Sequence, residues 1–307
     1  MSLFRPKSSE ANMSETLSVV YFSGTGGTQR VARAFAASLT RKGYIVNNIA
    51  LDSSSHIIHS ADEDSLFDAS KSVILIFAVH AFDAPEPVYR WLEKTEGDGK
   101  RTAVISVSGG GEVWPNTGCR ERIIRIMTAK GFSVEYEKMM IMPCNWVFSI
   151  EDEIAMHLIN NVSDKTEKIL ESFLSGINRR TNHHLSWLRR YISKLEKNSA
   201  RQFPKKTQVL ECCNACLWCV NHCPVNNIDL FDKKPQFGAD CVMCFRCIYG
   251  CPQDAIKAND FQVLKKGFNL RAVERRMAGK PLRPIEECCK GFLWSGVLHY
   301  LNDEDGY

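Results

Sequence analysis

Residues 213–224 read CNACLWCVNHCP, and residues 241–252 read CVMCFRCIYGCP. Both stretches hold four cysteines and a proline at the same spacing, so a shift of 28 residues places the first on the second. The match extends past the prolines, where residues 225–228 fall on residues 253–256. A repeated unit this short cannot bury a core alone. We therefore expect the two copies to fold together as one pseudo-symmetric body.

The cysteine spacing in each copy suits a cubane iron–sulfur cluster, because one tight loop supplies three thiolates and a fourth comes from elsewhere. The pattern resembles that of bacterial ferredoxins with two clusters, in which the fourth cysteine of each run binds the other cluster. This resemblance implies two [4Fe–4S] clusters. The implied ligands are Cys213, Cys216, Cys219 and Cys251 for cluster I, and Cys241, Cys244, Cys247 and Cys223 for cluster II.

A pair of zinc sites is the alternative, since C-x-x-C pairs also bind zinc. Zinc explains neither the third cysteine of each run nor the repeated Cys-Pro, where proline fixes φ for the turn out of the ligand loop. Cys212 precedes the first run, but the C-x-x-C spacing selects Cys213. No second C-x-x-C accompanies Cys288 and Cys289, which we interpret as free buried thiols rather than redox-active or metal-binding residues.

The composition is that of a soluble globular protein with about two domains, at 307 residues, 44% hydrophobic and 24% charged. Its longest uncharged runs are too short to span a bilayer, and no signal peptide is visible, so we expect a cytoplasmic protein. A reducing compartment also suits cluster thiolates.

The net charge of +4 is concentrated in residues 176–206 and 261–290. Most of these cations are interpreted as solvated helix faces. Their functional interpretation is a docking surface for an acidic redox partner protein, a ferredoxin or an oxidoreductase. Nucleic acid has no motif in its favour.

Residues 17–22 predict a buried strand, and an amphipathic helix follows and ends near Gly43. The loop between them is rich in glycine and hydroxyl groups, which makes it a cradle for an anion at a helix N-terminus. A Walker A loop would need a lysine, and Gln29 stands where a dinucleotide motif needs its third glycine. The loop instead resembles the FMN phosphate loop of flavodoxins. We call it the phosphate loop; its residues are Ser23, Gly24, Thr25, Gly26, Gly27 and Thr28.

Further strands are predicted at residues 44–48, 72–78, 102–108 and 132–138, and helices alternate with them. This alternation predicts an α/β fold with a parallel sheet covered on both faces. Five strands in this rhythm suit a flavodoxin-like, doubly wound sheet, and the resemblance to flavodoxins implies the strand order 2-1-3-4-5. Ligands of such sheets bind at the carboxyl ends of the strands.

Two loops at these strand ends have residues suited to a flavin ring. Consecutive glycines let the backbone approach a flat ring, and Phe82 and Trp114 could cover its two faces, with ordinary packing as the alternative for each. His80 either contacts the flavin or is structural. The candidate flavin contacts are Val79, His80, Ala81, Phe82, Ser108, Gly109, Gly110, Gly111 and Trp114.

Together, these motifs resemble the flavodoxin–ferredoxin fusions of anaerobic bacteria and archaea, sometimes labelled EFR1-family ferredoxins. The resemblance implies non-covalent FMN, two [4Fe–4S] clusters and electron transfer, although the chain lacks the acidic balance usual among flavodoxins. The expected domains are a flexible arm (1–16), a flavodoxin-like FMN-binding domain (17–150), a helical linker (151–204), an α+β two-cluster ferredoxin domain (205–260) and a C-terminal extension packed on the others (261–307).

The leading interpretation is an electron-transfer flavoprotein that relays single electrons between its clusters and a two-electron flavin. No residue is nominated as a general acid or base. One alternative is an FMN-dependent reductase of a small molecule, with His80, Trp114 and residues 144–146 lining a pocket. Another is a redox-sensing binding protein.

Overall fold

The structure is a computed structural model that describes residues 15–51, 67–114, 116–145, 150–181, 191–195, 198, 201–258, 269–291 and 294–302. The predicted N-terminal arm lies outside these residues except for its last two positions. Trp146, one of the residues expected to line a pocket over the flavin, also lies outside them. No helix in the described ranges is long and apolar enough to cross a membrane.

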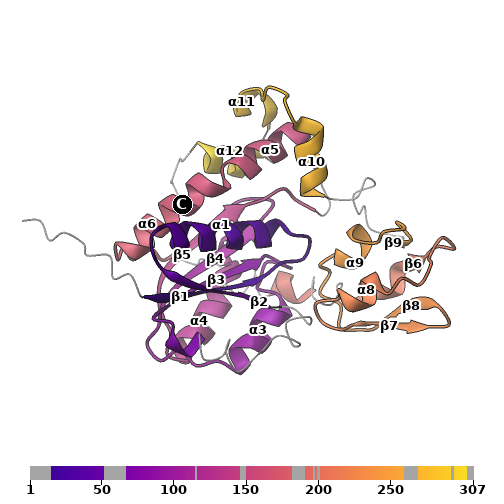
Figure 1. Cartoon of the computed structure of the whole chain (residues 1–307), viewed down its shortest axis with the longest axis horizontal. Coiled ribbons are helices and arrows are strands. Elements are labelled where there is room, and N and C mark those ends of the chain that lie inside the picture. The colour runs from indigo at the N-terminus through magenta and orange to yellow at the C-terminus, as the bar shows by residue number, and fades with distance from the viewer. Residues whose placement is uncertain are drawn as a thin grey trace, which may run out of the picture.

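The N-terminal half forms one parallel sheet, as the sequence predicts (Figure 1). Its strand order is β2-β1-β3-β4-β5, which confirms the predicted doubly wound topology. Strand β3 is buried from Ser72 to Phe77, as expected when helices cover both faces of a parallel sheet. The strands are β1 (Thr16–Phe22), β2 (Ile45–Ala50), β3 (Ser72–Ala78), β4 (Arg101–Ser108) and β5 (Ser133–Ile141).

The alternation of side chains along β1 divides the core into two layers. Val19 and Tyr21 pack on one face with apolar side chains of α1 (Gly27–Arg41), α5 (Asp152–Asn160) and α6 (Val162–Leu174). Val20 and Phe22 pack on the other. That face is covered by α3 (Glu86–Glu93), the 3-10 helix η2 (Asn116–Arg120) and α4 (Glu121–Ala129).

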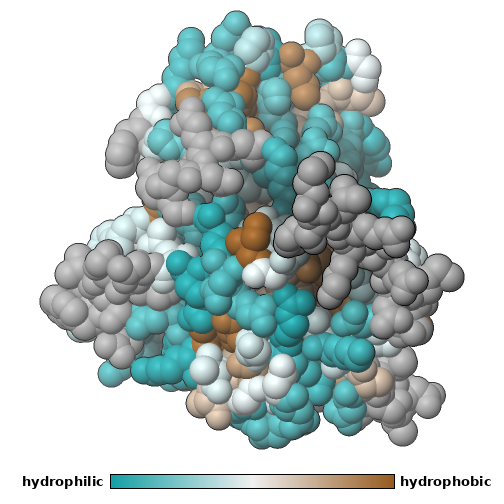
Figure 2. Space-filling model, turned by 90° about the vertical axis from the view of Figure 1, so that its left-hand side faces the viewer, coloured by the Kyte–Doolittle hydropathy of each residue, from teal (hydrophilic) through white to brown (hydrophobic). Residues whose placement is uncertain are grey.

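The helical segment predicted after the sheet includes α5 and α6, which pack on the α1 side of the sheet (Figure 1). The C-terminal helices are α10 (Leu270–Met277), α11 (Ile285–Cys288) and α12 (Ser295–Leu301). A small separate core joins Ile285, Cys289 and Val297 to Ile154 and Leu158 of α5. Figure 2 views the molecule from the α6 side, where hydrophilic residues make up most of the surface that is coloured by hydropathy and hydrophobic ones gather in small areas.

The cysteine-rich part, residues 203–258, lies beside the sheet and is called the cysteine unit below (Figure 1). It has two antiparallel pairs, β6 (Thr207–Val209) with β9 (Ile256–Ala258), and β7 (Ile228–Phe231) with β8 (Lys234–Phe237). The shift of 28 residues that aligns the sequence copies also places α8 (Trp218–Asn221) on α9 (Arg246–Tyr249).

The pseudo-symmetry extends to single backbone angles. Left-handed φ values, which are uncommon outside glycine, recur at equivalent positions of the two copies. The pairs are Ala215 (53°) with Met243 (50°), Leu217 (63°) with Phe245 (57°), and Asn226 (50°) with Asp254 (49°). The two copies therefore fold alike and together, as the repeated sequence predicts.

A buried cluster of charged residues, which no sequence motif predicted, connects the loop after β4 to strand β5. Arg120 is completely buried and donates to Glu137, also completely buried, at 2.8 Å, and to Ser106 Oγ at 2.7 Å. It also donates to Glu112, which directly follows the glycines of the β4 loop, and to Thr181 Oγ1 at 3.1 Å. This network fixes the β4 loop at the carboxyl edge of the sheet.

Replacing Arg120 with Met should lower the free energy of unfolding by about 2–4 kcal/mol, because the buried carboxylate of Glu137 would keep only the half-exposed Arg180 as a cationic partner, and Ser106 and Glu112 would lose a donor. Urea unfolding of the reduced, cofactor-free protein measures the loss. The control is Arg276→Met, which breaks the exposed Arg276–Asp152 pair and should cost less than about 1 kcal/mol. Equal losses in the two variants would contradict a structural role for the buried cluster.

Candidate cofactor site

The phosphate loop connects β1 to α1 and presents the start of that helix. The N-cap of α1 is Gly26, at φ 98°, with no capping side chain and no acidic residue in the first turn. The backbone N–H of Gly26 donates to Ser23 Oγ at 3.2 Å, which closes the loop. The first N–H groups of a helix have no partner within it, and a phosphate is a natural acceptor for them. Backbone donors, nearby hydroxyls and the lack of a competing carboxylate in the first turn fit the phosphate of FMN.

The loop after β3 is a tight turn held in an uncommon conformation. His80 and Asp83 exchange two backbone hydrogen bonds of 3.0 Å, and the two residues between them, Ala81 and Phe82, have φ values of 52° and 53°. Tyr89 Oη donates to Asp83 Oδ1 at 2.6 Å and anchors the turn. The ring of His80 meets the ring of Phe22 edge-on, with centroids 5.7 Å apart. The turn therefore lies beside the end of β1, at the beginning of the phosphate loop.

The glycines after β4 allow close approach of neighbouring chain segments. A Cβ at Gly109 would lie 2.6 Å from Cys144 Cβ, and one at Gly111, where φ is 84°, would lie 3.0 Å from Ile141 Cδ1. Gly111 N donates to Ser108 Oγ at 3.1 Å. Trp114, further along this loop, is 48% exposed.

The structure thus brings the ends of β1, β3 and β4 to one edge of the sheet, because neighbouring strands in this parallel sheet all end there. The contacts of individual residues in these loops with a flavin ring stay predictions.

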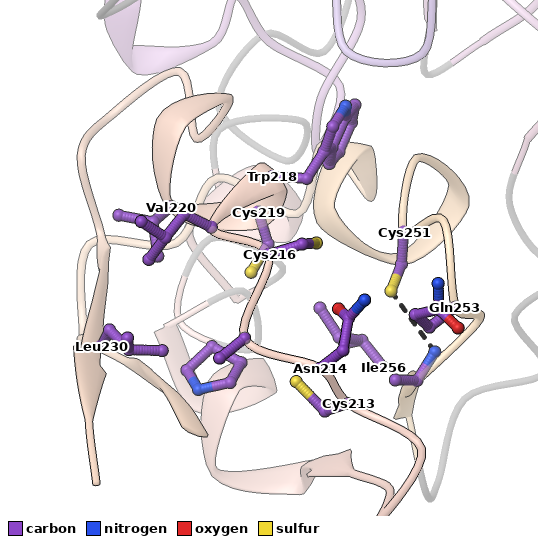
Figure 3. Close-up of a pocket in the computed structure, with 14 residues that line it drawn as sticks. Cys213, Asn214, Cys216, Trp218, Cys219, Val220, Leu230, Cys251, Gln253 and Ile256 are labelled. Atoms are coloured by element: carbon purple, nitrogen blue, oxygen red, sulfur yellow. Dashed lines mark hydrogen bonds between the residues drawn. The ribbon is translucent and has the colours of Figure 1, made fainter. Parts of the chain in front are cut away.

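Four of the predicted ligands surround one cavity in the cysteine unit. Cys213, Cys216, Cys219 and Cys251 line a space of about 360 Å³, including its open mouth, together with apolar side chains. Figure 3 shows Cys213 and Cys216 on one loop, Cys219 in helix α8 directly after it, and Cys251 opposite them on the other copy. The backbone N–H of Ala255 donates to Cys251 Sγ at 3.3 Å. This grouping is that of the predicted cluster I ligands.

The four predicted cluster II ligands lie close enough together to raise one another's pKa values. Burial raises the pKa of Cys241 to about 12, and the neighbouring Cys244 and Cys223 add to the rise. Burial likewise raises the pKa of Cys247, with further contributions from the other three thiols of this set. Gathered thiols of this kind ionise with difficulty on their own and are stabilised as thiolates by a bound metal centre.

Hydrogen bonds to sulfur follow the pseudo-symmetry. Asn227 N donates to Cys223 Sγ at 3.3 Å, and its equivalent in the second copy is the bond from Ala255 to Cys251. Bonds of this kind tune the potential of an iron–sulfur cluster. The donor set therefore fits cluster ligation. Within the described ranges, no three His, Cys, Asp or Glu side chains are close enough to hold a single metal ion.

The loop that holds Cys244 packs directly on the phosphate loop. A Cβ at Gly24 would lie only 2.8 Å from the carbonyl oxygen of Cys244. Cys244 belongs to the apolar core on the Phe22 side of the sheet. Arg246 Nε donates to Gly24 O at 3.0 Å. The two predicted sites, 220 residues apart along the chain, are therefore in contact, which no motif indicated.

The chain is similar to solved flavodoxin structures over about half of its length. A flavodoxin from the domain Archaea is 17% identical, with 50% of this chain and 98% of that chain covered at a TM-score of 0.33. The general stress protein 14 of Treponema denticola, solved in complex with FMN, is 11% identical, with 52% and 98% covered at a TM-score of 0.40. Flavodoxin 1 from Bacillus cereus is 15% identical, with 51% and 98% covered at 0.36. No protein-family model and no curated protein matches the chain.

Replacing Gly24 with Ala should separate the cysteine unit from the sheet. The added methyl group would clash with the backbone carbonyl of Cys244, which, unlike a side chain, cannot rotate out of the way. We expect a lower melting temperature and a larger radius of gyration by small-angle scattering for the cofactor-free protein, at a cost of about 1–3 kcal/mol. Gly27→Ala is the matched control, since its methyl group makes only an ordinary 3.5 Å contact with Met142 Cβ. Identical melting temperatures and radii for the two variants would contradict the packing of Cys244 on the phosphate loop.

Proposed function

We propose that the protein is an electron-transfer flavoprotein that holds one FMN and two [4Fe–4S] clusters. The observation that carries the proposal is the contact between Gly24 of the phosphate loop and Cys244 of the cluster II loop. Electron transfer between cofactors needs short separations, and this contact joins the two loops that would bind them. The flavodoxin-like sheet supports the flavin half of the proposal.

When bound, FMN takes up two electrons and each cluster takes up one, so a pair of clusters can match a one-electron partner to a two-electron flavin. The residues of the chain would then have three tasks. The phosphate loop binds the FMN phosphate through backbone N–H groups and hydroxyls. The loops after β3 and β4 hold the flavin ring. The eight cysteines bind the clusters, and backbone N–H groups such as that of Asn227 tune them.

The two ligand sets differ in exposure, and this suggests where a redox partner protein docks. Cys216 of cluster I is exposed, whereas Cys244 of cluster II is buried against the sheet. Phe231, on β7 of the cysteine unit, is 68% exposed, and Leu230, which lines the cluster I cavity, is 40% exposed. A partner protein would therefore exchange electrons at cluster I, with cluster II between it and the flavin.

Iron content tests two points: whether the protein binds two clusters, and whether the fourth cysteine of each run binds the cluster of the other run. The anaerobically purified protein should contain about eight iron atoms and one FMN per chain, and Cys213→Ser should lower the iron to about four. Adding Cys251→Ser to it should cause no further loss, because both residues bind cluster I. Adding Cys223→Ser should remove the remaining iron, because Cys223 binds cluster II.

The control is Cys288→Ser, which should retain all the iron. Loss of both clusters in the Cys213/Cys251 double variant, with one retained in the Cys213/Cys223 variant, would overturn the crossing. Two zinc ions in place of iron, or no FMN in the purified protein, would overturn the proposed function.

A further inference from the structure

The pseudo-symmetry of the cysteine unit is broken in its two short helices, α8 and α9. Helix α8 begins with Trp218 where α9 begins with Arg246. Trp218 stays within its own unit: it stacks on His222 with ring centroids 4.3 Å apart, and it fills the space where Gly250 has no side chain. Arg246 instead reaches across to the phosphate loop, so this position of the second copy binds the sheet domain.

The guanidinium of Arg246 binds the phosphate loop from its carbonyl side. Nε donates to Gly24 O at 3.0 Å, and a terminal nitrogen donates to Ser23 O. The other terminal nitrogen donates to His222 O, at 3.2 Å, within the cysteine unit. These bonds use carbonyl oxygens only, which leaves the N–H groups at the start of α1 available to an anion. The cation also adds positive charge next to a loop suited to a phosphate.

The last residue of α9 reaches the same loop by a second route. Tyr249 Oη donates to the backbone oxygen of Asn145 at 2.7 Å, and Asn145 Nδ2 donates to Thr25 Oγ1 at 2.7 Å. Helix α9 therefore binds Ser23 and Gly24 directly through Arg246, and it is linked to Thr25 through Tyr249 and Asn145. Cys244 and Cys247, two of the predicted cluster II ligands, lie just before and within α9, so a bound cluster II would hold α9 in place.

We propose that Arg246 and Tyr249 are positioning residues that fix the phosphate loop in its FMN-binding conformation, so that FMN binding and cluster II binding reinforce each other. The proposal rests on the proposed function, because it takes FMN and cluster II as the two ligands. Coupling of this kind is reciprocal: each bound cofactor raises the affinity for the other by the same factor.

FMN affinity tests the proposal without any electron-transfer assay. Quenching of FMN fluorescence gives the dissociation constant of the cluster-loaded protein after the flavin is removed. Arg246→Gln should raise it about tenfold to a hundredfold, because charge-assisted bonds to Ser23 and Gly24 are lost. Tyr249→Phe should raise it less, by about threefold to tenfold, and Arg246→Lys should restore part of the affinity.

The matched control is Lys234→Gln, which removes a cation of the same unit that pairs with the exposed Glu211 and does not bear on the phosphate loop. It should leave the affinity unchanged. Amide hydrogen exchange of residues 17–28 should rise in the Arg246→Gln protein but not in this control.

A cycle with the cluster II ligands tests the coupling itself. Cys241→Ser, which removes a cluster II ligand, should weaken FMN binding, and adding Arg246→Gln to it should weaken binding by much less than it does alone. Unchanged FMN affinity in Arg246→Gln, or full additivity with Cys241→Ser, would overturn the proposal. Faster hydrogen exchange with unchanged affinity would also overturn it and leave Arg246 as a docking contact only. A protein that binds no FMN before any substitution would instead overturn the proposed function.

Discussion

The close approach of two backbones at Gly24 is the constraint on which the arrangement of the two units depends. The carbonyl oxygen of Cys244 lies where a side chain at this position would begin, so only glycine lets the two loops meet. The same loop ends in the uncapped start of α1. The phosphate loop therefore has two roles: its N–H groups suit an anion, while its carbonyl groups bind Arg246 of the cysteine unit. Neither use competes with the other, because they involve opposite ends of the peptide dipole.

The two copies of the cysteine unit differ in how they meet the sheet domain, since Arg246 and Tyr249 of the second copy donate hydrogen bonds to it. Most of the repeat is preserved, down to left-handed backbone angles at the same positions of each ligand loop. The difference between Trp218 and Arg246 is enough to make the copies unequal, because a stacked indole stays within the unit whereas a guanidinium needs acceptors and finds them on the phosphate loop. In this way a pseudo-symmetric unit acquires a buried end, with Cys244, and an exposed end, with Cys216. The proposed relay would use this asymmetry, with one end toward the flavin and the other toward the partner.

Sequence reasoning succeeded where a pattern is local. The repeated spacing predicted that the two cysteine copies fold together, and periodicity predicted the parallel sheet, whose strand order is the one that the flavodoxin resemblance implies. The grouping of the cluster I cysteines around one cavity agrees with the ligand set that the ferredoxin resemblance implies. The contacts that join the units could not be predicted, because Arg246 and Gly24 are 222 positions apart and neither belongs to a periodic pattern. The buried bonds of Arg120 were missed for a similar reason: a charged residue in a helix is expected on the surface, and only the tertiary packing shows its partners. The differences between the two copies at Arg246, where the first copy has Trp218, and at Tyr249, where it has Asn221, were the visible signals of the docking.

The central claim is that one chain holds a flavin and two clusters in electronic contact. Anaerobic reductive titration of the fully loaded protein measures this most directly, by counting the electrons taken up per chain while the absorbance of flavin and clusters is followed. The account predicts about four electrons, two for FMN and one for each cluster, with all the cofactors reduced through any one electron donor. Uptake of about two electrons, by the flavin alone or by the clusters alone, would contradict it.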